Sequence, residues 1–217
     1  MEKDTSKGSQ ILDFAYDKCL TGIPKVSKPI EDLANDYISR YGNTDEAIDR
    51  LISNQLSKNT INGFIAGFGG IAFMKFSLPV NITSVTYVQM RMIAAIAIIK
   101  GYDLNEDAVQ TFVYACIVGK SAGDVLKKSG INFSNKVGQN VLSKIPGKVF
   151  IDLNKKLGFR FITKGGTKGI FNMGKAIPIL GAGFGSVFDY STTKIIANRA
   201  KKVFSEDGFI NIEALES

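Results

Sequence analysis

The chain has 217 residues, of which 45% are hydrophobic, a mean hydropathy of +0.07 and a net charge of +7 at pH 7. This composition fits one large domain with a sizeable core and excludes both a disordered chain and a polytopic membrane protein. The chain has no His, so a His-ligated zinc site and a His-dependent catalytic triad are excluded. Cys19 and Cys116 are the only thiols and form no CxxC motif, which predicts a reducing, cytoplasmic compartment. The polar first nine residues do not resemble a signal peptide.

Apolar residues recur at helical spacing in the first quarter of the chain. We expect a short helix over 9–20, a second from Pro29 to about Tyr41, and a third from an N-cap at Thr44 to about Ser57. The second and third helices are predicted to be an antiparallel pair joined by a tight turn.

The segment 59–74 is uncharged and rich in glycine. Glycine is unfavourable inside a helix, so this cluster needs either a packing reason or a loop. A phosphate-binding loop is the functional alternative, but the Walker Lys-Ser/Thr pair is missing. We therefore expect close packing between helices at these glycines and at a second group near the end of the chain: Gly63, Gly67, Gly69, Gly70, Gly181 and Gly185.

The next predicted helix, 81–100, is apolar on all sides and contains Gln89 and Arg91. A helix of this kind is buried, and a buried cation needs a partner. The small or polar residues around Asp189 make it our preferred partner for Arg91, and Asp103 is the second choice. Arg91 is then either part of a structural ion pair or a ligand-binding or proton-linked residue.

Further helices are predicted over 105–128, 131–145, 147–164 and 176–204, with no strand and a loosely held tail after 205. The expected fold is all-α: a compact multi-helix domain around central apolar, Gly-rich helices. We divide the chain into an N-terminal helix and linker, the main helical domain and the tail, at 1–28, 29–204 and 205–217.

Positive charge is concentrated in the second half of the chain. The segment 118–175 has twelve Lys and Arg but only Asp124 and Asp152 as acidic residues. Such asymmetry favours a surface that binds an anionic membrane or another polyanion, although solvated helix faces also explain it. The predicted basic surface lies on the helix 147–164: Lys148, Lys155, Lys156, Arg160 and Lys164.

Several short motifs follow one another along the chain. They are Gly63-Phe-Ile-Ala-Gly-Phe-Gly-Gly70, Leu78-Pro-Val80, Gln89-Met-Arg-Met92 and Gly101-Tyr-Asp103, supported by the Gly-rich stretch that ends at Gly185 and by Phe188-Asp189. Their order resembles the EcsC protein family over roughly 30–204. The family is named for a member encoded beside an ABC transporter implicated in secretion and competence. The resemblance implies a fold and a membrane-transport context, but no catalytic residues.

We therefore expect a non-enzymatic, cytoplasmic helical protein that is peripheral to a membrane or associated with an ABC transporter. Its expected partners are an anionic membrane surface or a membrane protein, and a lipid or apolar ligand held between the Gly-faced helices. No cofactor or metal is predicted. The alternatives are a pore-forming or membrane-inserting hairpin at 59–100 and nucleic-acid binding through 118–175, where Phe133, Phe150, Phe159 and Phe161 could stack on bases.

Overall fold

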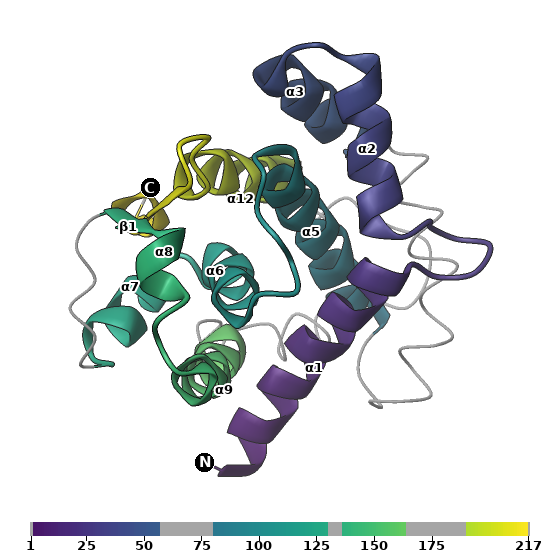
Figure 1. The fold of residues 1–217 in the computed structure, drawn as a ribbon. Helices are drawn as coiled ribbons and strands as arrows, with labels where there is room; N and C mark the ends of the chain where they lie inside the picture. The colour runs from purple at the N-terminus through teal and green to yellow at the C-terminus, as the bar shows by residue number, and fades with distance from the viewer. Residues whose placement is uncertain (1, 57–79, 130–135, 164–189, 217) are drawn as a thin grey trace.

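The structure is a computed structural model that describes residues 2–56, 80–129, 136–163 and 190–216 (Figure 1). The described part is almost entirely helical, as the sequence predicts. Its helices are α1 (Glu2–Thr21), α2 (Ile30–Arg40), α3 (Thr44–Gln55), α5 (Val80–Ile99), α6 (Asp107–Val118), α7 (Lys120–Lys127), α8 (Gln139–Leu142), α9 (Gly147–Thr163) and α12 (Tyr190–Val203). Two short strands, β1 (Lys136–Gly138) and β2 (Phe209–Asn211), and a 3₁₀ helix, η2 (Glu213–Glu216), complete it.

Helix α5 lies at the centre and packs against α1, α2, α3, α6 and α12. Every side chain from Thr86 to Ala97 is buried. The sequence predicts this arrangement, because a helix that is apolar on all sides must be covered on all sides. Within the described ranges, no helix is long and apolar enough to cross a bilayer.

Helices α2 and α3 form the predicted pair, but the cap of α3 lies one residue earlier than expected. The side chain of Asn43 accepts hydrogen bonds from the backbone N–H groups of Asp45 and Glu46, with N···Oδ1 distances of 2.8 and 3.2 Å. Asn43 has extended backbone angles, whereas Thr44 is already helical. Asn is a better N-cap residue than Thr, so residue type favours the observed cap over the predicted one.

The single helix predicted over 105–128 is wrong, because Gly119 divides it into α6 and α7. Gly119 has φ +68° and ψ −141°, a conformation that is essentially restricted to glycine. The chain turns there, so that α7 packs against α9 and η2 as well as α6.

The C-terminal segment is not the loosely held tail that the sequence predicted. Strand β2 pairs antiparallel with β1, with Val137 opposite Ile210. Ile210 and Leu215 are fully buried. The hydroxyl of Tyr102 lies 2.9 Å from the Ser205 carbonyl oxygen and 2.8 Å from that of Phe209. Buried apolar side chains and a long-range strand pair therefore fix this segment to the domain.

The same pairing corrects a second prediction. The expected helix over 131–145 is a strand at 136–138 followed by the four-residue α8, and its first residues lie outside the described part. A three-residue strand is too short to show an alternating pattern, and its partner lies more than seventy residues away in the chain.

Helix α1 extends from Glu2 rather than from residue 9, and it packs along α9 and α5. Figure 1 shows it crossing the lower part of the molecule beside both helices. The last predicted helix, 176–204, is described only from residue 190 onward, where it is α12.

Candidate functional site

Helix α9 has one buried side and one exposed side. Phe150, Leu153 and Leu157 are at most 2% exposed and face the core, where α9 packs against α1, α6 and α7. Their spacing of three and four residues gives the helix a single apolar stripe, as the sequence predicts. The opposite side of α9 is therefore left to the solvent.

Lysines dominate the exposed side of α9. Lys148, Lys155 and Lys156 are exposed, whereas Arg160 is half-buried. Asp152 is the acidic residue on this helix, and its carboxylate lies 3.7 Å from the Lys155 ammonium. Both side chains of that pair are more than half exposed, so water screens their attraction and the pair leaves most of the positive charge uncompensated. Lys164 lies outside the described residues.

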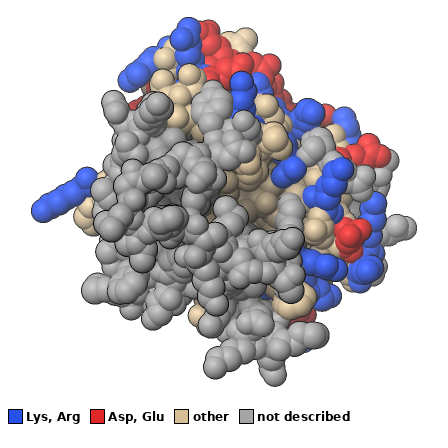
Figure 2. Space-filling view, turned by 180° about the vertical axis from the view of Figure 1, so that it is seen from behind, with Lys and Arg blue, Asp and Glu red and all other residues tan. Residues whose placement is uncertain are grey.

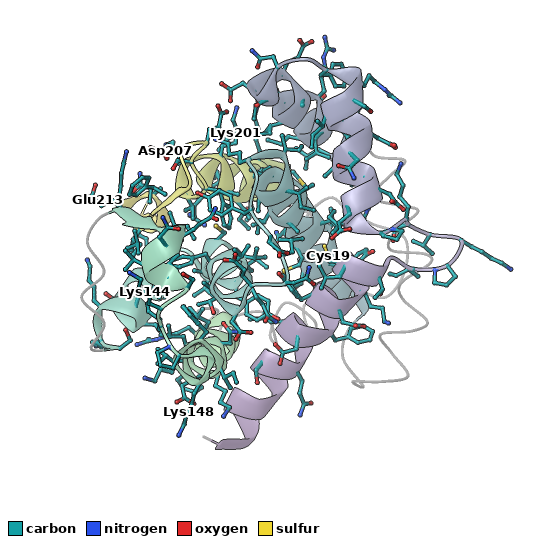
Figure 3. The ribbon with its side chains drawn as sticks, viewed as in Figure 1. Cys19, Lys144, Lys148, Lys201, Asp207 and Glu213 are labelled. Atoms are coloured by element: carbon teal, nitrogen blue, oxygen red, sulfur yellow. The ribbon has the colours of Figure 1, made fainter. Side chains whose placement is uncertain are left out.

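The chain before α9 extends the same surface. Lys144 follows α8 and is exposed, and Figure 3 shows Lys144 and Lys148 on the same side of the bundle, beside α8 and α9. Val141 and Ile151 are the exposed apolar side chains here. We call this surface the basic face and define it by six residues: Val141, Lys144, Lys148, Ile151, Lys155 and Lys156.

Further cations lie close to the basic face along the chain. Lys127 ends α7, Lys128 follows it as the C-cap and Lys136 begins β1, and all three are exposed. Figure 2 shows the molecule from behind, with several groups of Lys and Arg on the side where α7 and α9 lie and fewer groups of Asp and Glu. More Asp and Glu groups lie at the top, over α2 and α3, where they alternate with Lys and Arg.

Arg91 lies at a second, buried site. It is 2% exposed, in agreement with the predicted burial, and its Nη1 donates to the Lys28 carbonyl oxygen at 2.9 Å. The same nitrogen lies 3.4 Å from the Tyr87 hydroxyl, which is 2.6 Å from Ser27 Oγ. Ser27 Oγ in turn accepts from the Ile23 amide at 3.2 Å. Arg91 thus links the loop between α1 and α2 to the central helix α5 by a hydrogen bond.

The predicted partner of Arg91, Asp189, lies outside the described residues, so this pair stays a prediction. Asp103, the second choice, is exposed and accepts from the backbone and side-chain nitrogens of Asn105 at 2.8 and 2.9 Å. Gln89 is 8% exposed, and its Nε2 lies 3.4 Å from Thr193 Oγ1 of α12. Gln89 and Arg91 of α5 therefore contact different elements. The six packing glycines also lie outside the described residues.

The two thiols are fully buried. Burial raises the pKa of Cys19 to about 12, and the Arg91 charge lowers it by less. Burial likewise raises the pKa of Cys116 to about 12, against a smaller opposing effect of Arg199. Figure 3 shows Cys19 inside the bundle. Both thiols are therefore protonated at neutral pH and are poor nucleophiles. Within the described ranges, no group of His, Cys, Asp and Glu side chains could hold a metal ion.

The fold and surface define an α-helical domain with a buried arginine at its centre and a lysine-rich exterior on α9. The sequence pattern of the EcsC protein family matches residues 7–206, and the chain belongs to this family. It is 25% identical over 167 residues to the uncharacterized protein YdbA of Bacillus subtilis (strain 168). That match covers 75% of this chain and 57% of YdbA, so the chain corresponds to only part of its relative. No solved structure matches the chain.

Sequence reasoning found the lysines of α9 but missed Val141 and Ile151. The signal was available for Ile151, because it lies outside the sector formed by Phe150, Leu153 and Leu157. No local signal identifies the Lys28 carbonyl as the acceptor of Arg91, because that contact depends on the path of the chain between α1 and α2.

Proposed function

We propose that this protein is a non-enzymatic, peripheral membrane-binding helical protein whose basic face contacts anionic lipid headgroups from the cytoplasmic side. The core covers one side of α9, while the other side holds exposed lysines, with Asp152 as the only carboxylate on the helix. A helix with an outward lysine face suits an anionic membrane surface.

The magnitude of the expected attraction is sufficient for reversible binding. A Lys near an anionic membrane contributes about 1 kcal/mol, so the four lysines of the basic face supply roughly 4 kcal/mol before entropic costs. This attraction is screened beyond about 10 Å at 0.1 M salt. Binding should therefore be salt-sensitive and should require anionic lipid.

The packing of the described helices favours surface binding over insertion. Helix α5 is covered by five helices and anchors a loop through Arg91, so its entry into a bilayer would expose the whole core and a charged group. The rest of the hairpin predicted at 59–100 lies outside the described residues. An apolar ligand between the Gly-faced helices depends on residues that are also outside them.

Nucleic-acid binding receives less support. Phe150 was one of four aromatic side chains expected to stack on bases, but it is 2% exposed and lies in the core. Phe159 is partly buried, and the side chains of the other two lie outside the described part. Among the α9 side chains that the structure describes, the lysines are exposed and no aromatic ring is, whereas a single-strand site combines positive charge with aromatic rings that stack on bases.

A matched pair of triple variants tests the proposal. The first replaces Lys144, Lys148 and Lys155 by Gln. It should bind vesicles of phosphatidylserine and phosphatidylcholine about 100-fold more weakly than the wild type, because three contributions of about 1 kcal/mol are lost. The second variant has the same net charge but changes exposed cations elsewhere: Lys25, Arg40 and Lys202, each to Gln. It should retain most of the affinity, and equal losses in both variants would contradict a localised site.

The same proteins should be titrated with single-stranded poly(U) RNA. We expect weak binding that the two triple variants reduce alike. Tight RNA binding that depends on the basic face, together with no vesicle binding, would identify a nucleic-acid site and overturn the proposal.

A further inference from the structure

Two large apolar side chains lie exposed on the basic face. Val141 is 56% exposed and Ile151 is 51% exposed. Single exposed aliphatic residues are common and need no explanation by themselves. Ile195 of α12 is also exposed, at 53%, beside Lys194, but Val141 and Ile151 belong to the basic face with its four lysines.

On α9, Ile151 lies three residues after Lys148 and four residues before Lys155, so the three share one face of the helix. Val141 lies three residues before Lys144, and Lys144 lies four residues before Lys148. The two apolar side chains are thus bracketed by cations along the chain.

Backbone hydrogen bonds and a buried leucine hold the corner between α8 and α9 in place. The Ser143 amide donates to the Gln139 carbonyl at 2.9 Å, and the Val149 amide donates to the Pro146 carbonyl at 2.9 Å. Leu142 is 1% exposed, so it anchors α8 in the core. The apolar residues of the corner are therefore divided between an inward set and the outward pair Val141 and Ile151.

The exposed isoleucine of α2 provides a contrast. Ile38 is 45% exposed, but the exposed charged residues of its helix are three carboxylates, Glu31, Asp32 and Asp36, and one cation, Arg40, so the helix is net negative. An anionic membrane would repel that surface. Charge complementarity therefore assigns a bilayer to the surroundings of Ile151 and not to those of Ile38.

We infer that Val141 and Ile151 insert shallowly into the boundary between headgroups and acyl chains of an anionic bilayer, while Lys144, Lys148 and Lys155 bind the surrounding headgroups. This inference rests on the proposed function and adds a second, salt-resistant contribution to it. Lysines suit this role because their aliphatic stems lie along apolar surface while their ammonium groups remain in the polar layer.

The absence of Trp from the chain allows a direct test. The Ile151→Trp variant introduces a single Trp at an exposed position, where the substitution leaves the core intact. On addition of anionic vesicles, its emission should shift to the blue and should be quenched by lipids brominated near the top of the acyl chain. The matched Ile38→Trp variant should bind the same vesicles with an unchanged emission maximum.

A double variant, Val141→Ser with Ile151→Ser, measures the apolar contribution to binding. It should bind anionic vesicles about 10-fold more weakly, because the two partly inserted side chains are lost. The dependence of its affinity on salt should remain that of the wild type, since every lysine is retained.

The outcomes separate this inference from the proposed function. Wild-type binding with no spectral shift in Ile151→Trp and no loss in the double serine variant would overturn the inference and leave purely electrostatic binding. Equal shifts in Ile151→Trp and Ile38→Trp would also overturn it. No vesicle binding by the wild type would overturn the inference and the proposed function together.

Discussion

Helices α5 and α9 both place basic side chains in an apolar sequence, yet they use them differently. Arg91 of α5 is 2% exposed and donates to a backbone carbonyl of the loop between α1 and α2. The lysines of α9 are exposed, and Lys155 has only a screened contact with Asp152. A cation's surroundings, rather than its presence, therefore decide between a structural and a binding role.

Substitutions at Arg91 and at the lysines of α9 should therefore affect different properties of the protein. A buried guanidinium holds its acceptors in place, so its loss should alter folding and leave surface attraction intact. An exposed lysine contributes little to stability, so its loss should alter binding and leave folding intact. Three substitutions test the folding side of this comparison.

The largest effect is expected for Arg91→Met. This variant should lose about 2–4 kcal/mol of unfolding free energy, because the Lys28 carbonyl and the Tyr87 hydroxyl lose a charged donor in the core. The matched variant on α9, Lys155→Met, should change the unfolding free energy by less than about 0.5 kcal/mol. Urea unfolding of both variants measures the difference, and similar values would show that the contrast between the helices is wrong.

A second test addresses the loop that Arg91 holds. Gly22 has φ +76°, and a Cβ there would lie 2.6 Å from the Ser27 carbonyl oxygen. Gly22→Ala should therefore cost about 2 kcal/mol, through strain and displacement of the loop. A Cβ at Gly42 would have no atom within 4 Å, so Gly42→Ala should be close to neutral. Thermal unfolding distinguishes the two, and a neutral Gly22→Ala would mean that the loop is not tightly fixed.

The smallest effect is expected at the contact between α1 and α6, where the Tyr114 hydroxyl donates to Asp13 Oδ1 at 2.8 Å. Desolvation raises the pKa of Asp13, and the hydrogen bond from Tyr114 lowers it by less. The folded chain therefore binds the proton more tightly than the unfolded chain. Stability should fall as the pH rises from the usual value of 3.8 through the higher folded pKa, and the ionised Asp13 is unfavourable at neutral pH.

Asp13→Asn keeps an acceptor for Tyr114 and removes the desolvated charge. It should stabilise the protein at pH 7 by less than about 1 kcal/mol, because solvent screens this partly exposed group. It should also flatten the decline of stability with rising pH. Urea midpoints at pH 4 and pH 7 measure both effects, and a destabilised Asn variant at pH 7 would contradict this assignment.

The strongly periodic elements could be predicted from the sequence, and the breaks between them could not. The uniform apolarity of α5 and the single stripe of α9 were sufficient to predict a buried and a half-exposed helix. Gly119 was missed because an isolated glycine is compatible with a helix until its φ is known. The pairing of Val137 with Ile210 depends on chain segments far apart, which no local pattern reports.

The site residues, too, could be predicted only where local sequence determines their position. The lysines of α9 follow from charge and spacing, whereas the outward position of Val141 depends on how the corner between α8 and α9 packs. The acceptor of Arg91 is a backbone carbonyl, and every residue carries one, so residue type gives no indication of it.

We propose that the basic face binds an anionic membrane surface while the apolar centre stays folded. Flotation of the purified protein with neutral and anionic vesicles, at low and high salt, tests it most directly. We expect binding to anionic vesicles only, strong at low salt and much weaker at high salt. Salt-resistant binding to both kinds of vesicle would point to insertion of the 59–100 region and would contradict the account, as would no binding to either.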